Sequence, residues 1–310
     1  METKGFIPVM LTPFKDNGNI DFEGLTELTE VYLEAGAAGL FANCLSSEMF
    51  ELTDSERLQV IEHVIHIAAG EVPVIATGTF GGPIAKQADF VKRVNDTGVN
   101  AVVTITSLLA QEQESDDIFE NNVFELFKQT ENIPLGFYEC PVPYKRVLKP
   151  AQLQQFVATG RVSYHKDTSL DLDQIKQKLA LTKDLSPDFG LYDAYMVHAV
   201  ESLKAGSAGL SCIQGNYFPE LIVWLCDHYN DPNLTTEIAV VQEFLTDHMD
   251  VMHQVYPIVS KYFLQKRGLN ISTFTRRNVG DFTPAIIADV DTLMHDYLKL
   301  LHDFNIKVII

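Results

Sequence analysis

The sequence predicts a (β/α)8 barrel followed by a helical extension. Short runs rich in β-branched and aromatic residues alternate with longer amphipathic segments over the first three quarters of the chain. The chain has 310 residues, which accommodates one barrel of about 250 residues and an appendage. Beyond Asp227 the pattern becomes entirely helical. We therefore expect a barrel domain at residues 1–228 and a helical extension at residues 229–310.

The expected strands lie near Ile7–Leu11, Gly39–Ala42, Val74–Thr77, Ala101–Thr106, Leu135–Tyr138, Val162–Lys166, Gly190–Tyr192 and Gly209–Ser211. The helical segments between and after them are Phe22–Glu34, Thr53–Ala69, Pro83–Asp96, Asp117–Gln129, Pro150–Ala158, Leu172–Leu181, Tyr195–Lys204 and Tyr217–Cys226. Repeated strand–helix units predict a parallel sheet, and eight of them predict closure into a barrel. A doubly wound open sheet is the alternative, but no GxGxxG motif follows the first strand.

Local signals support several helix boundaries. Thr53 and Glu56 have the spacing of a capping box, and Pro150 stands where a first-turn proline is tolerated. In the extension, Thr235–Leu264 and Pro284–Leu301 predict two long helices, joined by a loop that carries Arg276 and Arg277.

Composition limits the classes of function. Apolar residues make up 46% of the chain and charged residues 21%, as in ordinary globular proteins. The net charge of −19 disfavours nucleic acid and anionic membrane surfaces as partners. No apolar run approaches the roughly 18 residues of a membrane span, and the N-terminus does not resemble a secretory signal. We therefore expect a cytoplasmic protein with no nucleic-acid or membrane partner.

The strand Val162–Lys166 ends in a lysine. Side chains alternate along a strand, so if Val162 and Tyr164 point into the barrel, Lys166 does too. Burial at the C-terminal end of a barrel strand lowers the pKa of an ammonium group, and a neutral amine is the nucleophile that attacks a ketone. The alternative is a lysine that forms an ion pair with a carboxylate such as Asp167.

The preceding strand ends in Tyr138, which alternation places at the same level of the barrel as Lys166. A phenol beside an amine can transfer protons while a carbinolamine forms and loses water. The alternative is a core tyrosine whose hydroxyl bonds elsewhere.

Loops after other strands supply candidates for substrate binding. Ser46 and Ser47 offer hydroxyls and turn amides to a carboxylate, or else form a simple turn before the next helix. Thr79 follows the third strand, beside glycines that allow close approach of a ligand. Ser211 and Ile213, at the end of the eighth strand, complete the candidates.

Three cysteines, Cys44, Cys140 and Cys212, each fall at or just after a predicted strand end. A soft metal held by these thiols is one interpretation. We favour a small, uncharged lining and expect neither a metal nor an organic cofactor. His165 should face the outer helix layer by alternation.

These residues together resemble the N-acetylneuraminate lyase and dihydrodipicolinate synthase family over roughly residues 5–230. The resemblance rests on the following segments: Thr12-Pro13-Phe14, Gly18, Ile20-Asp21, Ser47-Glu48, Glu56-Arg57, Gly78-Thr79, Tyr138 with Pro141, and Lys166-Asp167-Thr168. It implies a TIM barrel that assembles as a homo-oligomer, a dimer or tetramer. It also implies a class I aldolase or lyase in which Lys166 forms a Schiff base with pyruvate or another 2-oxo acid and Tyr138 transfers protons. The second substrate would be an aldehyde, or the intact substrate a keto-deoxy sugar acid.

Departures from the family pattern concern the second substrate. Leu45 stands where the family has the first hydroxyl of its strand-two loop. The segment Thr106–Leu109 has no tyrosine, although the synthases place one there. Val142-Pro143-Tyr144 stands where the synthases have an arginine, with Lys145 and Arg146 just beyond. The alternatives are therefore a condensing synthase or a 2-keto-3-deoxy sugar acid dehydratase of the same family, or a non-catalytic barrel that binds a 2-oxo acid.

Overall fold

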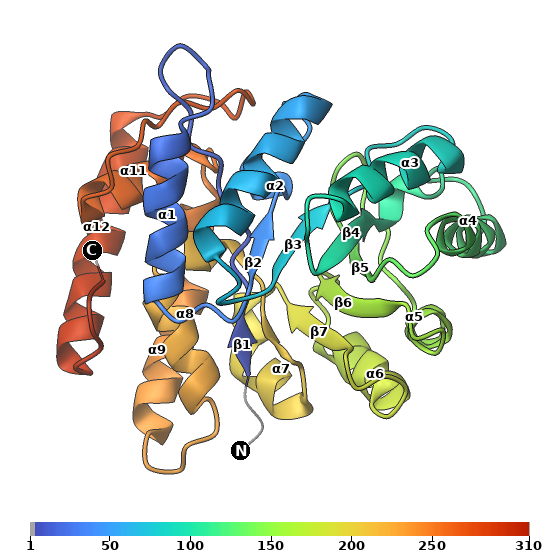
Figure 1. Cartoon of the computed structure of the whole chain (residues 1–310). Helices are drawn as coiled ribbons and strands as arrows, with labels where there is room; N and C mark the ends of the chain where they lie inside the picture. Colours follow the sequence, from blue (N-terminus) through green and yellow to red (C-terminus); the bar gives the residue numbers. More distant parts are fainter. Residues whose placement is uncertain (1–3, 310) are drawn as a thin grey trace.

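The computed structural model describes residues 4–309, and these residues form the expected barrel (Figure 1). All pairings in the eight-stranded sheet are parallel, in the order β1-β8-β7-β6-β5-β4-β3-β2. The strands are β1 (Gly5–Phe6), β2 (Leu40–Ala42), β3 (Val74–Thr77), β4 (Ala101–Ile105), β5 (Leu135–Tyr138), β6 (Val162–Asp167), β7 (Gly190–Asp193) and β8 (Gly209–Leu210). The order is that of consecutive β–α units, so the barrel prediction is confirmed and the open doubly wound sheet is excluded.

The cylinder closes just beyond β1. Val9 bridges Phe41 of β2, the Met10 amide donates to the Phe41 carbonyl at 3.1 Å, and the Phe41 amide donates to the Pro8 carbonyl at 3.0 Å. The predicted first strand, Ile7–Leu11, is displaced in the structure, where regular pairing is confined to Gly5–Phe6. Pro8 accounts for the difference, because a proline has no N–H to continue the ladder.

Helices cover the outside of the sheet (Figure 1). They are α1 (Phe22–Glu34), α2 (Asp54–Ala68), α3 (Ile84–Asn95), α4 (Asp116–Gln129), α5 (Pro150–Val157), α6 (Leu172–Thr182), α7 (Ala199–Ala205) and α8 (Pro219–His228). The predicted capping box at Thr53 and Glu56 is present, and Pro150 begins α5 as expected. The eighth helix begins at Pro219 rather than at Tyr217, because residues 213–216 form a 3-10 turn.

The extension differs from the two predicted helices. Thr235–Leu264 is not one helix but three, α9 (Thr235–Asp247), α10 (Met249–His253) and α11 (Ile258–Arg267), and α12 spans Pro284–Asp303. Pro257 accounts for the break before α11, since proline cannot continue a helical hydrogen-bond ladder. Within residues 4–309, none of the helices combines the length and apolar character needed to span a bilayer.

Two apolar clusters lie on opposite faces of the sheet. The larger one packs the helices against the strands, and the smaller one fills the barrel interior with side chains such as Ile75, Val103, Tyr138 and Tyr164. Neighbouring residues of one strand belong to different clusters, as strand alternation requires. The strands therefore alternate between the barrel interior and the helix layer, which is the pattern from which an inward Lys166 was predicted.

An ion pair fastens the extension to α2. Both terminal guanidinium nitrogens of Arg276 contact the Glu56 carboxylate, at 3.0 and 2.6 Å, and Arg276 also donates to the Gly18 and Glu51 carbonyls. The hydrogen bonds from Arg276 outweigh the opposing effect of burial and lower the pKa of Glu56 to about 2. The carboxylate therefore stabilises the folded chain above the ordinary pKa of glutamate, and the contribution is lost as pH falls through about 2.

We expect Glu56→Gln to lower the free energy of unfolding by about 2 kcal/mol at pH 7, and by much less at pH 2. Glutamine keeps an oxygen acceptor for the capping box, so the difference isolates the charge. Urea unfolding of the wild-type and Glu56→Gln proteins at pH 7 and pH 2 measures this difference in free energy. The other carboxylates are the same in the two proteins, so their protonation cancels in the comparison. A difference that does not change with pH would contradict the assignment to the Arg276 pair.

Candidate active site

Lys166 points into the barrel from β6, with 4% of its surface exposed. Burial lowers the pKa of its amine, and nearby polar groups, Cys212 foremost, oppose this shift. The amine donates a hydrogen bond to the Ser211 carbonyl. Among residues 4–309, Lys166 forms no ion pair, and Asp167 points to the other face of the sheet. The alternative of a structural ion pair between Lys166 and Asp167 is therefore excluded.

Tyr138 lies beside Lys166, because β5 and β6 pair these two residues in register. The lysine Nζ is 5.3 Å from the centroid of the tyrosine ring. The ring is 5% exposed and packs edge-on against Phe41, with 5.9 Å between centroids. Burial raises the pKa of Tyr138, and the neighbouring Cys140 raises it further. The pair therefore combines an amine biased towards its neutral form with a phenol that keeps its proton.

The outer face of the same strands carries a buried charged cluster, Glu139, His165, Asp167 and Lys178. The Lys178 amine donates to Glu139 at 2.7 Å and to Asp167 at 2.6 Å, and the imidazole lies 3.4 and 3.6 Å from the same two carboxylates. Burial alone would lower the pKa of His165, but hydrogen bonding with Asp167 and Glu139 outweighs it and raises the pKa. His165 thus faces the helix layer as expected.

This cluster has the spacing of metal ligands, since one ligand atom each of Glu139, His165 and Asp167 lies within 4.8 Å of the others. The Lys178 ammonium bonds to both carboxylates and supplies the positive charge that a cation would bring. Glu139 also accepts hydrogen bonds from the backbone amides of Leu148 and Thr168, at 2.9 and 2.8 Å. The cluster therefore fixes the ends of β5 and β6 directly behind Tyr138 and Lys166.

Ser211 contacts Lys166 through its backbone. Its hydroxyl donates to the Ile7 carbonyl at 2.9 Å and accepts from the Tyr164 hydroxyl at 2.8 Å. Its carbonyl accepts from the lysine. The sequence predicted Ser211 as a substrate-binding residue. The structure places it next to the Lys166 amine, but its hydroxyl proton is donated to the Ile7 carbonyl.

The strand-two loop separates its two serines. Leu45–Ser47 form a 3-10 turn, and the Ser47 hydroxyl accepts from the Cys44 amide at 3.0 Å and donates to the Met10 carbonyl at 2.6 Å. Ser46, 5% exposed, donates no hydrogen bond among the described residues. The Ser47 hydroxyl thus holds the turn together, whereas the Ser46 hydroxyl keeps its proton for another partner.

The remaining two candidates lie at the ends of β3 and β8. The Thr79 hydroxyl is fully buried and accepts from the Ile105 amide at 2.8 Å, which ties the loop after β3 to β4. Gly78 precedes it, and a Cβ at that position would lie 2.3 Å from Val102. Ile213 is partly buried and packs on the interior cluster that contains Tyr138 and Tyr164.

The three cysteines are free, buried thiols. Cys44 and Cys140 belong to the interior apolar cluster, whereas Cys212 packs with the cluster between strands and helices. Burial raises the pKa of Cys44, and it raises the pKa of Cys140 to about 11 and that of Cys212 to about 12. All three interact electrostatically with Lys166. The only group with metal-ligand spacing that the described residues contain is the outer cluster. The thiols therefore form a neutral lining around the amine, as the sequence favoured.

Arg146 is held by the loop that follows β4. It donates to the Gln111 and Glu114 carbonyls at 2.9 and 3.1 Å, lies 3.3 Å from the Asp116 carboxylate, and contacts the Tyr144 hydroxyl at 3.0 Å. These bonds occupy the guanidinium. Arg146 is thus committed to the loop rather than directed at Lys166.

Sequence reasoning missed three polar residues at the barrel mouth, Tyr32, Asn216 and Tyr256. The Asn216 amide donates to the Tyr256 hydroxyl at 2.6 Å and its carbonyl oxygen accepts from Tyr32 at 2.5 Å. Tyr256 comes from the extension and lies within the predicted helix Thr235–Leu264. No local pattern marks it, because its position depends on how α10 and α11 fold back over the barrel.

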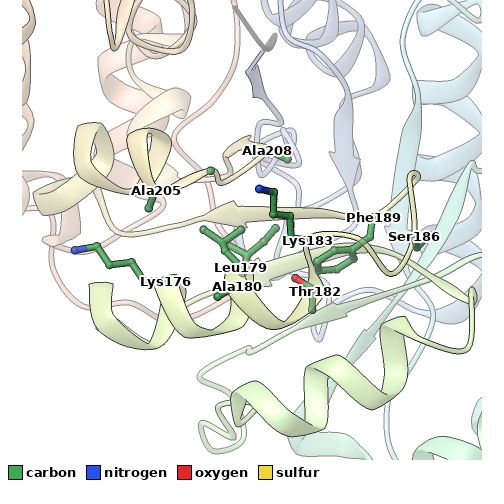
Figure 2. Close-up of a pocket in the computed structure, with 11 residues that line it drawn as sticks. Lys176, Leu179, Ala180, Thr182, Lys183, Ser186, Phe189, Ala205 and Ala208 are labelled. Carbon is green, nitrogen blue, oxygen red and sulfur yellow. The ribbon is translucent and has the colours of Figure 1, made fainter.

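Two of the grooves on the described part of the chain lie at opposite ends of the barrel. One, of about 550 Å³, runs between α6 and α7 and is lined by Lys176, Leu179 and Phe189 (Figure 2). It lies towards the N-terminal ends of the strands, away from Lys166, and barrel active sites lie at the other end. A second groove, of about 660 Å³, is formed by the loops after β3, β4 and β5 and so lies at the Lys166 end.

Known proteins share this fold and sequence pattern. A sequence model of the Dihydrodipicolinate synthetase family matches residues 2–295. The 4-hydroxy-tetrahydrodipicolinate synthase of Hyphomonas neptunium is 26% identical over 265 residues, covering 86% of this chain and 88% of that protein. The enzyme of the same name from Methanothrix thermoacetophila is 24% identical, covering 88% of this chain and 86% of that protein.

Solved structures agree on the fold. The dihydrodipicolinate synthase of Thermotoga maritima superposes with a TM-score of 0.85 at 22% identity, covering 97% of this chain and 100% of that one. CdNal from Clostridium difficile, solved in complex with mannosamine, has a TM-score of 0.83 at 15% identity, covering 96% and 100%. The chain therefore belongs to the dihydrodipicolinate synthetase family, whose members are Schiff-base-dependent enzymes of the aldolase type.

Proposed function

We propose that Lys166 forms a Schiff base with pyruvate or another 2-oxo acid, and that the derived enamine makes or breaks a carbon–carbon bond. One observation carries the proposal. A buried amine that forms no ion pair within residues 4–309 lies beside a phenol whose pKa is raised. A lysine in this setting has lost hydration without gaining an ion pair. This burial penalises the charged ammonium and favours the neutral amine, which is the form that attacks a ketone.

The chemistry uses these two side chains. The neutral Lys166 amine attacks the C2 carbonyl, the N–C bond forms, and the carbonyl π pair moves to oxygen, which takes the proton that the nitrogen loses. The Tyr138 phenol donates the proton with which the hydroxyl leaves as water, and an iminium remains. The Tyr138 phenolate left by this step takes a C3 proton, which gives the enamine and restores the phenol. C3 of the enamine attacks the aldehyde carbon, and the aldehyde oxygen takes the proton back from the phenol. Cleavage is the reverse, with the iminium as the electron sink.

The neighbouring residues have proposed roles in substrate binding. The Ser46 hydroxyl, with the backbone amides of its turn, donates to the carboxylate of the 2-oxo acid. Ser47 and Thr79 hold the loops that shape this pocket, because their hydroxyls bond within those loops. Ser211 orients the amine through its carbonyl, and Ile213 provides an apolar wall.

The aldehyde is proposed to be uncharged and hydroxylated, as released from a keto-deoxy sugar acid. Arg146 supports this, because its donors are used by the loop after β4 and are not available to hold a second carboxylate. A condensing synthase whose aldehyde carries a carboxylate is less well supported for the same reason. The homo-oligomeric state and the cytoplasmic location stay predictions from the sequence.

Reductive trapping tests the proposal. We expect incubation with pyruvate and sodium borohydride, followed by intact mass, to show one reduced pyruvyl group per chain, located on Lys166 by peptide mapping. Lys176→Ala serves as a matched control, because Lys176 is an exposed lysine at the opposite end of the barrel, and it should give the same adduct. An adduct absent from the wild-type protein would contradict the Schiff base. Thermal stabilisation by pyruvate without an adduct would instead support a 2-oxo-acid-binding barrel.

A further inference from the structure

A single ammonium group joins the chain neighbours of Tyr138 and Lys166. Glu139 follows Tyr138 at the end of β5, and Asp167 follows Lys166 at the end of β6. The Lys178 amine, which comes from α6, donates to Glu139 Oε1 at 2.7 Å and to Asp167 Oδ2 at 2.6 Å. Lys178 therefore bridges the two strands directly behind the side chains that are proposed to react.

The backbone pairing between β5 and β6 is weak at this end. The two strands shift register between Leu135 and Gly136, and the Glu139 amide lies 3.5 Å from the Lys166 carbonyl, a long distance for an N–H···O bond. Side chains complete the junction instead. The Thr168 hydroxyl donates to the Glu139 carbonyl at 2.6 Å, and the Thr168 amide donates to Glu139 Oε2 at 2.8 Å. The spacing of the strand ends therefore depends on the direction of the Glu139 side chain.

The charges of this cluster need Lys178. Glu139, His165, Asp167 and Lys178 are all fully buried. One oxygen of each carboxylate lies within 4.8 Å of the other, so without a shared cation the two negative charges would repel each other across the strand ends. His165 is 3.4 and 3.6 Å from them, but one imidazolium cannot balance two carboxylates. Buried ion pairs are often no more stabilising than apolar side chains of the same volume, so the geometry that the cluster fixes explains it better than stability does.

We propose that Lys178 is a positioning residue, which sets the distance between the Tyr138 phenol and the Lys166 amine. The inference rests on the proposed Schiff-base function. Without the ammonium, repulsion between Glu139 and Asp167 separates the strand ends and carries the two reacting side chains apart. Transfer of the phenol proton to the carbinolamine is the step that slows, because a displacement of about 1 Å can lower a rate about 10²-fold.

Lys178→Met tests the inference, because methionine fills the space of the stem and removes the ammonium. The rate of cyanoborohydride trapping, with the reductant in excess, is measured against pyruvate concentration. We expect the maximal rate to fall about 10- to 100-fold, as for a displaced catalytic group, while half-saturation changes less than about threefold. Binding is expected to survive because Lys178 lies on the other face of the sheet from the substrate.

A double-mutant cycle separates positioning from a purely structural role. In the Tyr138→Phe background, Lys178→Met should lower the maximal rate by less than about threefold, because no phenol remains to be positioned. A structural role would lower the rate equally in both backgrounds. Arg267→Met is the matched control. It breaks another buried ion pair, 2.5 Å long, between Arg267 on α11 and Glu220 on α8, and should lower stability while it keeps the trapping rate.

Lys178→Met/Asp167→Asn covers the case in which the single variant does not fold. It removes one charge of each sign, and asparagine keeps an oxygen for the Ser169 amide, which donates to Asp167 Oδ1 at 2.8 Å. We expect this variant to fold and to lose at least about 10-fold in maximal rate, because no ammonium bridges the strand ends. A wild-type rate in either folded variant, or equal losses with and without Tyr138→Phe, would overturn the inference alone. No adduct in the wild-type protein would overturn the Schiff base and this inference together.

Discussion

Lys166→Ala is expected to abolish both turnover and the borohydride-trapped adduct. The imine requires a nitrogen nucleophile inside the barrel, and the fully buried lysines Lys178 and Lys261 cannot replace it. Lys178 bonds to two carboxylates on the outer face of the sheet, and Lys261 bonds to Glu48. Both amines are therefore bonded to carboxylates and held away from the barrel interior. Intact mass after reduction with pyruvate measures the loss directly, and pyruvate release or consumption measures turnover.

The fold of this variant is expected to survive. Lys166 is buried and forms no ion pair among the described residues, so its removal relieves a desolvation cost and breaks no salt bridge. We expect Lys166→Met, which keeps the apolar stem, to melt at or above the wild-type temperature while it lacks the adduct. Such a trade of stability for function is typical of active-site residues. Turnover by a well-folded Lys166→Ala protein would rule out the imine at this residue.

The barrel and the pairing of Lys166 with Tyr138 could be predicted because both follow from local rules. Strand alternation decides which face a side chain occupies, and parallel register places the ends of neighbouring strands at one level. The same rule placed His165 in the outer layer, where it lies between Glu139 and Asp167. A one-residue error in the position of β6 would have exchanged the two faces.

Other features could not be predicted because they depend on distant partners. Ser46 and Ser47 look equivalent in the sequence, yet only Ser47 meets the Met10 carbonyl, 37 positions away. Ser211 looks like a free hydroxyl until Tyr164 and Ile7 approach it. The sequence pattern predicts which way a side chain points, but not which hydrogen-bond partners distant segments place beside it.

The extension shows the same limit over a longer range. Helical periodicity continued through Pro257, and the break there became visible only in the structure. The break brings Tyr256 to Asn216, 40 positions away, and lets Lys261 reach Glu48, 213 positions away. A prediction that gave proline more weight than periodicity would have placed a break before α11, but not the earlier one between α9 and α10. The contacts at the barrel mouth would still have been missed.

Tyr138→Phe is expected to slow turnover by about 10²- to 10⁴-fold, the usual contribution of a general acid–base group. Phenylalanine keeps the ring that packs against Phe41, so the free energy of unfolding should change little. The imine should still form, because the amine is intact, but the carbinolamine must lose water without the phenol. Single-turnover trapping with pyruvate should therefore reach the wild-type end point slowly. Tyr229→Phe, another buried tyrosine at the end of α8, should keep wild-type rates. Wild-type rates in Tyr138→Phe would show that protons reach the carbinolamine by another route, and Tyr138 would then be a packing residue beside Lys166.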